Sequence, residues 1–228
     1  MTKVTFVLAC ALACAALLPQ SAHAQSRAPL DDPYWGVKLQ LGLGSEVSRT
    51  LADIIPGFDA RENANLDVSI GVAGQYVHPL HKYFAIGGQV GLLSWASSDI
   101  GLSNGSRNVL FDLAALPVGR YQVMRELELY ATVPLGLSFD FLNDVSREYR
   151  TNAGNIASID GGAAVGFMIG FLAGVRYQLS QSVGLLGELG FVHRTYSHSV
   201  TATFGAGSLD GDLSVSFGQF AMNFGAYF

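Results

Sequence analysis

The C-terminal stretch of the chain, residues 214–228, reads SVSFGQFAMNFGAYF. Every second residue is apolar at Phe220, Met222, Phe224 and Ala226, and the residues between them are mostly small or polar. A period of two predicts a β-strand with one apolar face. The same alternation occurs in soluble sandwiches and in barrels, so the rest of the chain has to separate the two.

The composition is too apolar for an ordinary soluble domain. The 228 residues are 50% hydrophobic and only 14% charged, whereas soluble domains carry about 25% charged residues. After the N-terminus the sequence has no apolar run of the roughly 18 residues needed for a membrane-spanning helix. An apolar, glycine-rich chain without such a run indicates a transmembrane β-barrel.

The N-terminus is typical of a secretion signal. Lys3 precedes an apolar run over residues 4–18, and Ala-His-Ala at residues 22–24 fits the small-residue rule for cleavage. Both cysteines, Cys10 and Cys14, lie in this segment, so we expect neither thiol chemistry nor a cofactor in the mature chain. The sequence thus predicts a cleaved signal peptide over residues 1–24, a periplasmic linker over 25–33 and one barrel domain over 34–228.

The alternation of apolar residues repeats eight times along the chain. We expect strands over residues 34–44, 65–77, 83–95, 108–121, 126–141, 164–179, 183–196 and 212–228. Short turns alternate with long loops, and the long loops are expected over residues 45–64, 96–107, 142–163 and 197–211. Short periplasmic turns and long outer loops are typical of outer-membrane barrels. The predicted fold is therefore an all-β, eight-stranded, closed, antiparallel, up-and-down transmembrane barrel.

Two irregularities interrupt this pattern. The alternation slips between Phe217 and Phe220, which predicts a β-bulge near Gly218. Pro117 and Pro134 lie inside two adjacent predicted strands at similar heights, where each lacks a donor for the strand ladder. One shared irregularity is expected to accommodate both prolines.

The two faces of the predicted strands differ in charge. One face has no charged residue, and the other carries Lys38, Asp67, Asp112, Arg120, Glu128, Asp140, Arg176, Glu188 and Arg194. Small residues fill the rest of the charged face, as a narrow lumen requires. Aromatic residues at the short-turn ends predict an interfacial girdle of Tyr34, Trp35, Tyr76, Tyr83, Phe84, Tyr121, Tyr177, Tyr227 and Phe228. These features favour a barrel in the cell outer membrane of a Gram-negative envelope over a soluble sandwich.

The first and last predicted strands, YWGVKLQLGLG at residues 34–44 and FAMNFGAYF at residues 220–228, carry a family resemblance. The chain resembles the small eight-stranded outer-membrane barrels, similar to the transmembrane domain of outer membrane protein A and the opacity-type proteins. The resemblance implies an assembly signal formed by Phe220, Met222, Phe224 and Phe228, and the barrel-assembly machinery as a partner. Outer-membrane lipid and lipopolysaccharide are the other expected partners of what we expect to be a monomer. A net charge of −5 without a basic run argues against nucleic-acid binding.

Five charged residues fall in the periplasmic half of the predicted lumen, namely Lys38, Arg120, Glu128, Arg176 and Glu188. The last four lie on neighbouring strands with alternating sign, so we expect a salt-bridge network. We favour a static polar plug over the gate that the resemblance suggests, because unpaired charge in a dry interior is costly. The predicted function is a barrel of structural or surface-interaction type with a closed lumen and no enzymatic activity. The alternative is a porin-like diffusion channel for ions or small apolar solutes.

Three further groups of residues have weaker chemical readings. A lipid A-modifying enzyme would need a Ser-His-Asp arrangement, for which the candidates are His193, Tyr196, Ser197, His198, Ser199, Asp210 and Asp212. We interpret these residues as a polar rim, since they match no hydrolase motif. His78 and His81 flank Pro79 in a short turn, where a solvated turn is a simpler interpretation than a metal site. Residues 147–150, Arg-Glu-Tyr-Arg, could contact a surface partner that the sequence does not specify.

Overall fold

The computed structural model describes residues 29–52, 60–66, 68–95, 108–140, 147–150, 156–161, 163–204 and 207–228. The predicted signal peptide, the loop over residues 96–107 and Asp67 lie outside these ranges. A 3₁₀ turn, η1 (Pro29–Asp31), comes first. The strands are β1 (Tyr34–Leu43), β2 (Ser45–Ala52), β3 (Ala60–Leu66), β4 (Ser69–His81), β5 (Phe84–Trp95), β6 (Asn108–Met124), β7 (Leu127–Thr132), β8 (Leu135–Asp140), β9 (Arg147–Arg150), β10 (Ile156–Gly161), β11 (Ala164–Gln178), β12 (Gly184–Phe204) and β13 (Gly207–Tyr227). Over the ranges described, no helix is long and apolar enough to cross a membrane.

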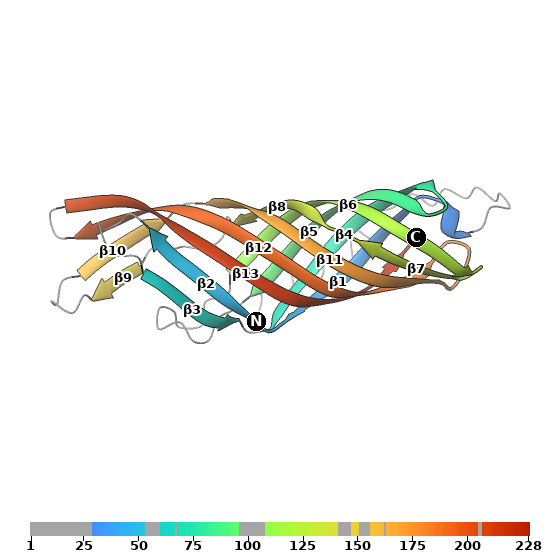
Figure 1. The fold of residues 1–228 in the computed structure, drawn as a ribbon, viewed down its shortest axis with the longest axis horizontal. Coiled ribbons are helices and arrows are strands. Elements are labelled where there is room, and N and C mark those ends of the chain that lie inside the picture. The colour runs from blue at the N-terminus through green and yellow to red at the C-terminus, as the bar shows by residue number, and fades with distance from the viewer. Residues whose placement is uncertain are drawn as a thin grey trace.

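The strands form an eight-membered antiparallel ring. The order is β1, β4, β5, β6, the interrupted strand β7–β8, β11, β12 and β13, and β13 pairs with β1 again. Figure 1 shows these strands winding obliquely around the long axis. The prediction of an all-β, antiparallel, eight-stranded sheet is confirmed.

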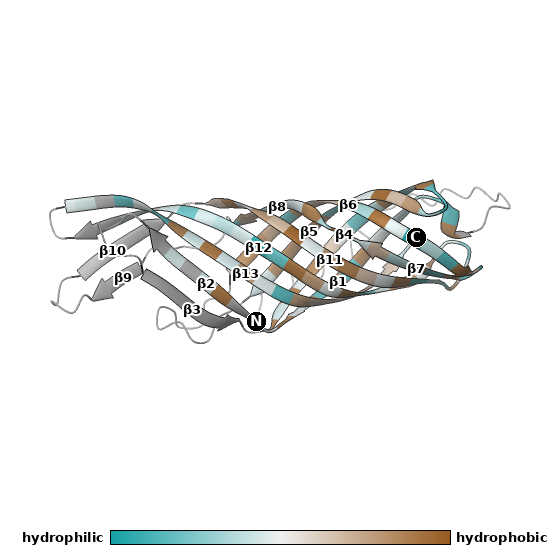
Figure 2. Cartoon of the chain, in the orientation of Figure 1, coloured by the Kyte–Doolittle hydropathy of each residue, from teal (hydrophilic) through white to brown (hydrophobic). Residues whose placement is uncertain are grey.

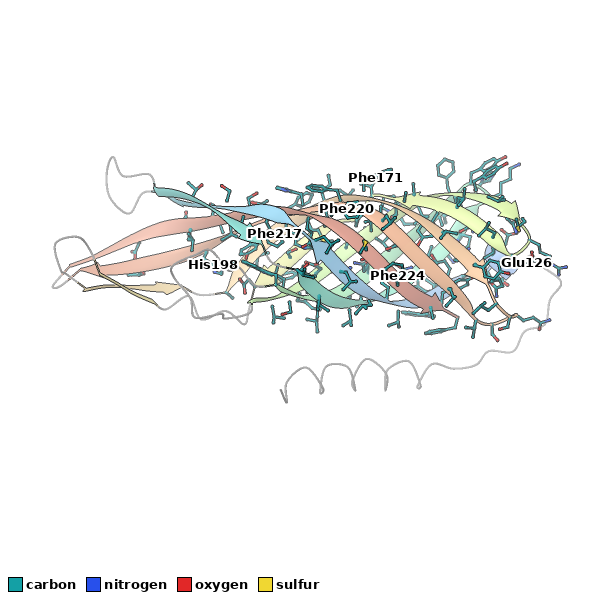
Figure 3. All side chains as sticks on the ribbon, turned by 90° about the horizontal axis from the view of Figure 1, so that it is seen from below. Glu126, Phe171, His198, Phe217, Phe220 and Phe224 are labelled. Carbon is teal, nitrogen blue, oxygen red and sulfur yellow. The ribbon has the colours of Figure 1, made fainter. Side chains whose placement is uncertain are left out.

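The ring carries its large apolar side chains outside and many polar and charged side chains inside, the reverse of a soluble domain. Large apolar side chains are exposed on the outside, as with Leu129 at 48% exposure, while the next residue, Tyr130, is buried at 7%. Figure 3 labels Phe171, Phe220 and Phe224, which are likewise exposed on the outer wall. Figure 2 shows hydrophobic positions concentrated on the strands of the ring. Such an apolar outer band matches the lipid-facing surface of a membrane barrel.

The two ends of the ring differ, and we name them here. The turn end carries the tight connections at residues 82–83, 125–126 and 179–183, together with η1 and Phe228. The extension consists of β2, β3, β9, β10 and the adjoining parts of β12 and β13, which continue beyond the ring at its other end (Figure 1). The expectation of long loops over 45–64, 142–163 and 197–211 is therefore wrong for most of these residues. They form strands because paired strands satisfy backbone hydrogen bonds that a loop would leave to water.

The predicted bulge near Gly218 is also wrong. The register between β12 and β13 runs without a shift from Gly184↔Tyr227 to Phe204↔Gly207. Phe217 is 1% exposed because it faces the lumen, so it keeps the strand's alternation rather than breaking it. The irregularity lies on the neighbouring strand, where the three residues 44–46 face the two residues 218–219. Gly44 adopts a φ of 41° there, the left-handed conformation that a bulge glycine provides.

The two prolines share one interruption. Pro134 separates β7 from β8, but the register against β6 and β11 continues unchanged across the gap. The carbonyl of Pro117 accepts from the Val133 amide at 3.3 Å and from Thr132 Oγ1 at 2.9 Å. These contacts replace part of the ladder that prolines cannot supply.

The predicted aromatic girdle needs one correction. Trp35, Tyr83, Phe84, Tyr121 and Tyr177 are exposed on the outside, as an interfacial girdle requires. Tyr34 and Tyr227 instead point into the lumen and are 7% and 3% exposed. They fall on the inward parity of β1 and β13, which outweighs their position at the turn end.

Candidate functional site: the filled lumen

Glu128 is the centre of a charge cluster at the turn end of the lumen. It lies on β7 directly opposite Arg176 of β11, and Arg120 reaches it from β6. Arg176 Nη2 is 3.0 Å from Glu128 Oε1, and Arg120 Nε is 2.9 Å from Oε2. All three side chains are buried. One carboxylate therefore faces two guanidinium groups from the two flanking strands.

Glu188 forms a second charge cluster beside the first. It accepts from Lys38 Nζ at 2.7 Å, from Tyr130 Oη at 2.9 Å and from Asn223 Nδ2 at 2.8 Å. The sequence places Glu188 in one alternating arc with Arg176, but in the structure its cationic partner is Lys38. Inward side chains on β1, β7, β12 and β13 meet across the lumen, which neighbour-strand spacing does not reveal. We call the two clusters together the turn-end network.

Residues 29–31 pack into the turn end of the lumen. Leu30 is fully buried among apolar residues that include Tyr34, Leu116 and Leu186. Its carbonyl oxygen accepts from Arg120 Nη2 at 2.8 Å and from Arg176 Nη2 at 2.9 Å. The sequence predicts residues 25–33 as a linker, and the structure shows that Leu30, within this range, is buried. Leu30 is the only large apolar residue of the predicted linker, and this signal is too weak to predict its burial.

The Arg176 and Arg120 side chains also contact residues near η1 and on the last strand. Arg120 Nη2 forms an ion pair with Asp31 Oδ1 at 2.8 Å. The Arg176 guanidinium lies over the rings of Tyr34 and Tyr227, 4.2 and 5.0 Å from their centroids. A desolvated cation over an aromatic face adds stabilisation to the ion pair.

The middle of the lumen is packed with amides and aliphatic side chains. Gln40, Gln89, Gln219, Asn223, Met168 and Leu172 are among the residues around a cavity of about 10 Å³. A cavity of this size holds roughly one water molecule. It offers no room for a hydrated ion or an organic solute.

The far end of the lumen contains mainly buried apolar and aromatic residues. This far-end cluster consists of Val47, Leu93, Trp95, Leu110, Ala164, Tyr196, Val215 and Phe217. The Trp95 and Phe217 rings are 5.3 Å apart and come from β5 and β13, on different sides of the ring. Their contact spans the lumen rather than following the wall.

A buried ion pair and a buried histidine–aspartate contact accompany the far-end cluster. Arg194 Nη2 on β12 is 2.8 Å from Asp112 Oδ2 on β6, and Ser138 donates to Asp112 Oδ1 at 2.5 Å. His198 Nε2 lies 3.3 Å from Asp140 Oδ2. The sequence places Asp112, Asp140 and Arg194 on the inner face but assigns His198 to the polar rim, and it singles out neither pair. The two partners of each contact lie at the same height along the lumen. This height can be predicted only when the strand register is known.

The structure does not gather the predicted polar rim into one site. His198 faces the lumen, whereas His193 faces outward and lies 3.2 Å from Ser216 Oγ. Asp210 and Asp212 accept from Thr201 and Ser199 on the outside of the extension. The two histidines therefore occupy opposite faces of β12. Among the residues that the structure describes, no group of three or more His, Cys, Asp or Glu side chains is placed to hold a metal ion.

The remaining candidates are the two turn histidines and residues 147–150, and they lie outside the lumen. His78 and His81 are both exposed near the turn end, and His81 Nδ1 accepts from the Tyr83 amide at 3.4 Å. Residues 147–150 form β9, which pairs with β10 in the extension. This placement keeps β9 apart from the lumen sites.

No protein-family model and no curated protein matches the sequence. Among solved structures, the fold is similar to that of the outer membrane protein OprG from Pseudomonas aeruginosa. The TM-score is 0.55 and the identity 11%, over 86% of this chain and 96% of that chain. Lower TM-scores are found for the outer membrane protein AlkL, 0.46 at 19% identity over 92% and 96% of the two chains. The attachment invasion locus protein Ail of Yersinia pestis gives 0.30 at 9% identity over 82% and 97%.

The similarity to OprG establishes the fold alone. The chain has the fold of the small outer-membrane β-barrel proteins. The predicted location in the cell outer membrane agrees with that fold and with the apolar outer band.

Proposed function

We propose that this protein is a closed outer-membrane β-barrel of structural or surface-interaction type, without an open axial pore and without enzymatic activity. The turn end, with η1 and Phe228, would face the periplasm, and the extension would project outside the cell. Lipopolysaccharide and phospholipid would surround the apolar outer band of what we take to be a monomer.

The observation that carries this proposal is the packing of the lumen. The turn-end network, the 10 Å³ middle cavity and the far-end cluster follow one another along the axis. An eight-stranded barrel has an interior just wide enough for side chains to fill. With its charges paired and its middle packed, such an interior supports a plug in preference to a water-filled path.

The test of a closed lumen is the conductance of refolded protein in planar bilayers. We expect no steady channels from the wild type, and a barrel of known conductance serves as the positive control. Steady channels of defined size would contradict the plug and support the diffusion-channel alternative. Incubation of the same preparation with lipid A should leave its acyl chains intact, and released fatty acid would contradict the non-enzymatic assignment.

The surface-interaction part of the proposal is supported by the outward face of the extension. Thr201 Oγ1 donates to Asp210 at 2.8 Å, and Ser199 Oγ donates to Asp212 at 3.4 Å. Ser197 and Ser214 continue this polar row toward the ring. A polar outer face suits water rather than hydrocarbon.

Cysteine labelling tests the proposed orientation, because both native cysteines lie in the predicted signal peptide. On intact cells, a membrane-impermeant maleimide should label Thr201→Cys. Leu80→Cys, at an exposed position of the turn end, should be labelled only after the outer membrane is permeabilised. The opposite pattern would reverse the orientation.

Assembly is proposed to depend on Phe220, Met222, Phe224 and Phe228. Phe228 exchanges two backbone hydrogen bonds of 2.9 Å with Trp35, which join the last strand to the first. Removal of Phe228 should lower the amount of folded protein in the outer membrane while secretion continues, as fractionation and heat-modifiability on gels would show. Normal outer-membrane levels of the truncated protein would argue against this role.

A further inference from the structure

A recess of about 400 Å³ lies on the outer wall, over β1, β4, β5 and β6. Trp35, Tyr76, Val90 and Leu113 project around it, and Phe228 borders it at the turn end. None of the residues that line it has a charged side chain. Its volume is within the range of small-molecule pockets, about 300–1,000 Å³.

The recess exists because two outward positions lack side chains. Gly74 lies between Val37 and Val90 in the register, and Gly88 lies beside Tyr76. A Cβ at Gly74 or Gly88 would find its nearest neighbour only at 3.9 Å. Glycine at these two positions is therefore not required by close packing.

An inward glycine shows the contrast. A Cβ at Gly136 would lie 2.0 Å from the Leu113 carbonyl oxygen, so that glycine permits a close approach of two strands. Side chains at Gly74 or Gly88 would instead fill the recess and leave the ring intact. The two positions thus allow the recess to be removed experimentally.

We propose that this recess binds one acyl chain of a membrane phospholipid. The proposal rests on the proposed membrane placement, since it requires the outer wall to face hydrocarbon. The recess is continuous with the exposed apolar band, and its outward side chains are apolar or aromatic, as a hydrocarbon ligand requires. The two polar residues in its lining, Gln75 and Gln89, are buried. Trp35 and Tyr76, with ring centroids 4.8 Å apart, border it near the turn end. Because such rings prefer the membrane interface, the lipid belongs to the leaflet at the turn end.

A flexible chain fits this recess better than a second copy of the protein. Projecting side chains surround the two glycine positions, so the convex wall of another barrel would rest on the rim and leave the recess unfilled. An acyl chain can enter between these side chains and replace the missing contacts.

Native mass spectrometry of protein purified from outer membranes provides the first test. The wild type should retain one phospholipid, and the filled variant Gly74→Leu/Gly88→Leu should lose it. The matched control is Gly187→Leu, an outward glycine on β12 whose Cβ would also meet its nearest atom only at 3.9 Å. The control should retain the lipid. Equal retention by all three proteins, or a dimer that only the filled variant loses, would overturn the proposal.

Tryptophan quenching by phospholipids brominated on the acyl chain provides the second test. Trp35 is 51% exposed, whereas Trp95 is 1% exposed and supplies the unquenched signal. Titration of detergent-solubilised, delipidated wild type should show a saturable quenching component that is lost in the filled variant. Quenching that rises linearly in both proteins means annular contact only and overturns the site. Absence of any quenching in brominated bilayers would instead contradict the membrane placement.

The single variant Gly88→Leu guards against misfolding of the double variant. Each protein is first checked for heat-modifiable migration on gels and for a β-sheet circular dichroism spectrum. The single variant should weaken the saturable component at least tenfold. A folded Gly88→Leu protein with wild-type saturation would also overturn the proposal.

Discussion

The two ends of the lumen are packed with different kinds of side chains. At the turn end, Glu128 and Glu188 each accept from several donors, and the Leu30 carbonyl accepts from the same arginines that contact Glu128. At the far end, apolar contacts such as Trp95 with Phe217 span the lumen, and Asp112 pairs with one arginine. Removing one group should therefore disturb the turn end more, because several charges depend on the same carboxylate.

Glu128→Ala should have the largest effect. It leaves Arg176 buried without a carboxylate partner and leaves Arg120 with only the part-exposed Asp31, and breaking a buried pair costs roughly 3–5 kcal/mol. Asp112→Ala strands only Arg194 and should fall at the lower end, about 3 kcal/mol. Denaturant unfolding in lipid vesicles measures both.

The conductance of the same variants sharpens the comparison. A static plug predicts that Glu128→Ala is destabilised but passes little or no current. A large current without destabilisation would instead identify the turn-end network as a gate. Equal destabilisation by both substitutions would remove the proposed difference between the ends.

Leu30→Ala should have a smaller effect. Truncation of this buried leucine removes its packing against Tyr34 and Leu186, at a cost of about 2 kcal/mol, near the lower end for Leu→Ala. The matched control is Leu80→Ala, whose side chain is 65% exposed and should change the unfolding free energy by less than about 0.5 kcal/mol. If Leu30→Ala behaves like the control, the N-terminal segment does not contribute to closure of the turn end.

Residues 197–211 of the extension are predicted as a loop, although part of this sequence alternates as a strand does. Residues 195–204, TYSHSVTATF, alternate Ser or Thr with other residues, and threonine is favoured in strands. The residues between them, Tyr196, His198, Val200, Ala202 and Phe204, mix polar with apolar side chains, so the alternation resembled a polar connection. The pairing of β12 with β13 continues through it because each strand supplies the backbone partners of the other.

Alternation along the sequence predicts which strand residues face inward and which outward, and Phe217, at the predicted slip, is an exception. That property is local, since successive side chains of a strand point to opposite faces wherever the strand ends up. Leu129 and Tyr130 illustrate it, because their assignment needs no knowledge of any other strand. The ring of eight strands follows from the same alternation with the turn spacing.

Which inward residues meet follows from the assembled ring and not from alternation along one strand. Glu188 pairs with Lys38, 150 positions away in the chain, and Leu30 docks against Arg120 and Arg176. These pairings depend on the strand stagger and on the width of the ring, which bring side chains together across the lumen. The outer recess arises in the same way, because Gly74 and Gly88 become neighbours only when β4 pairs with β5.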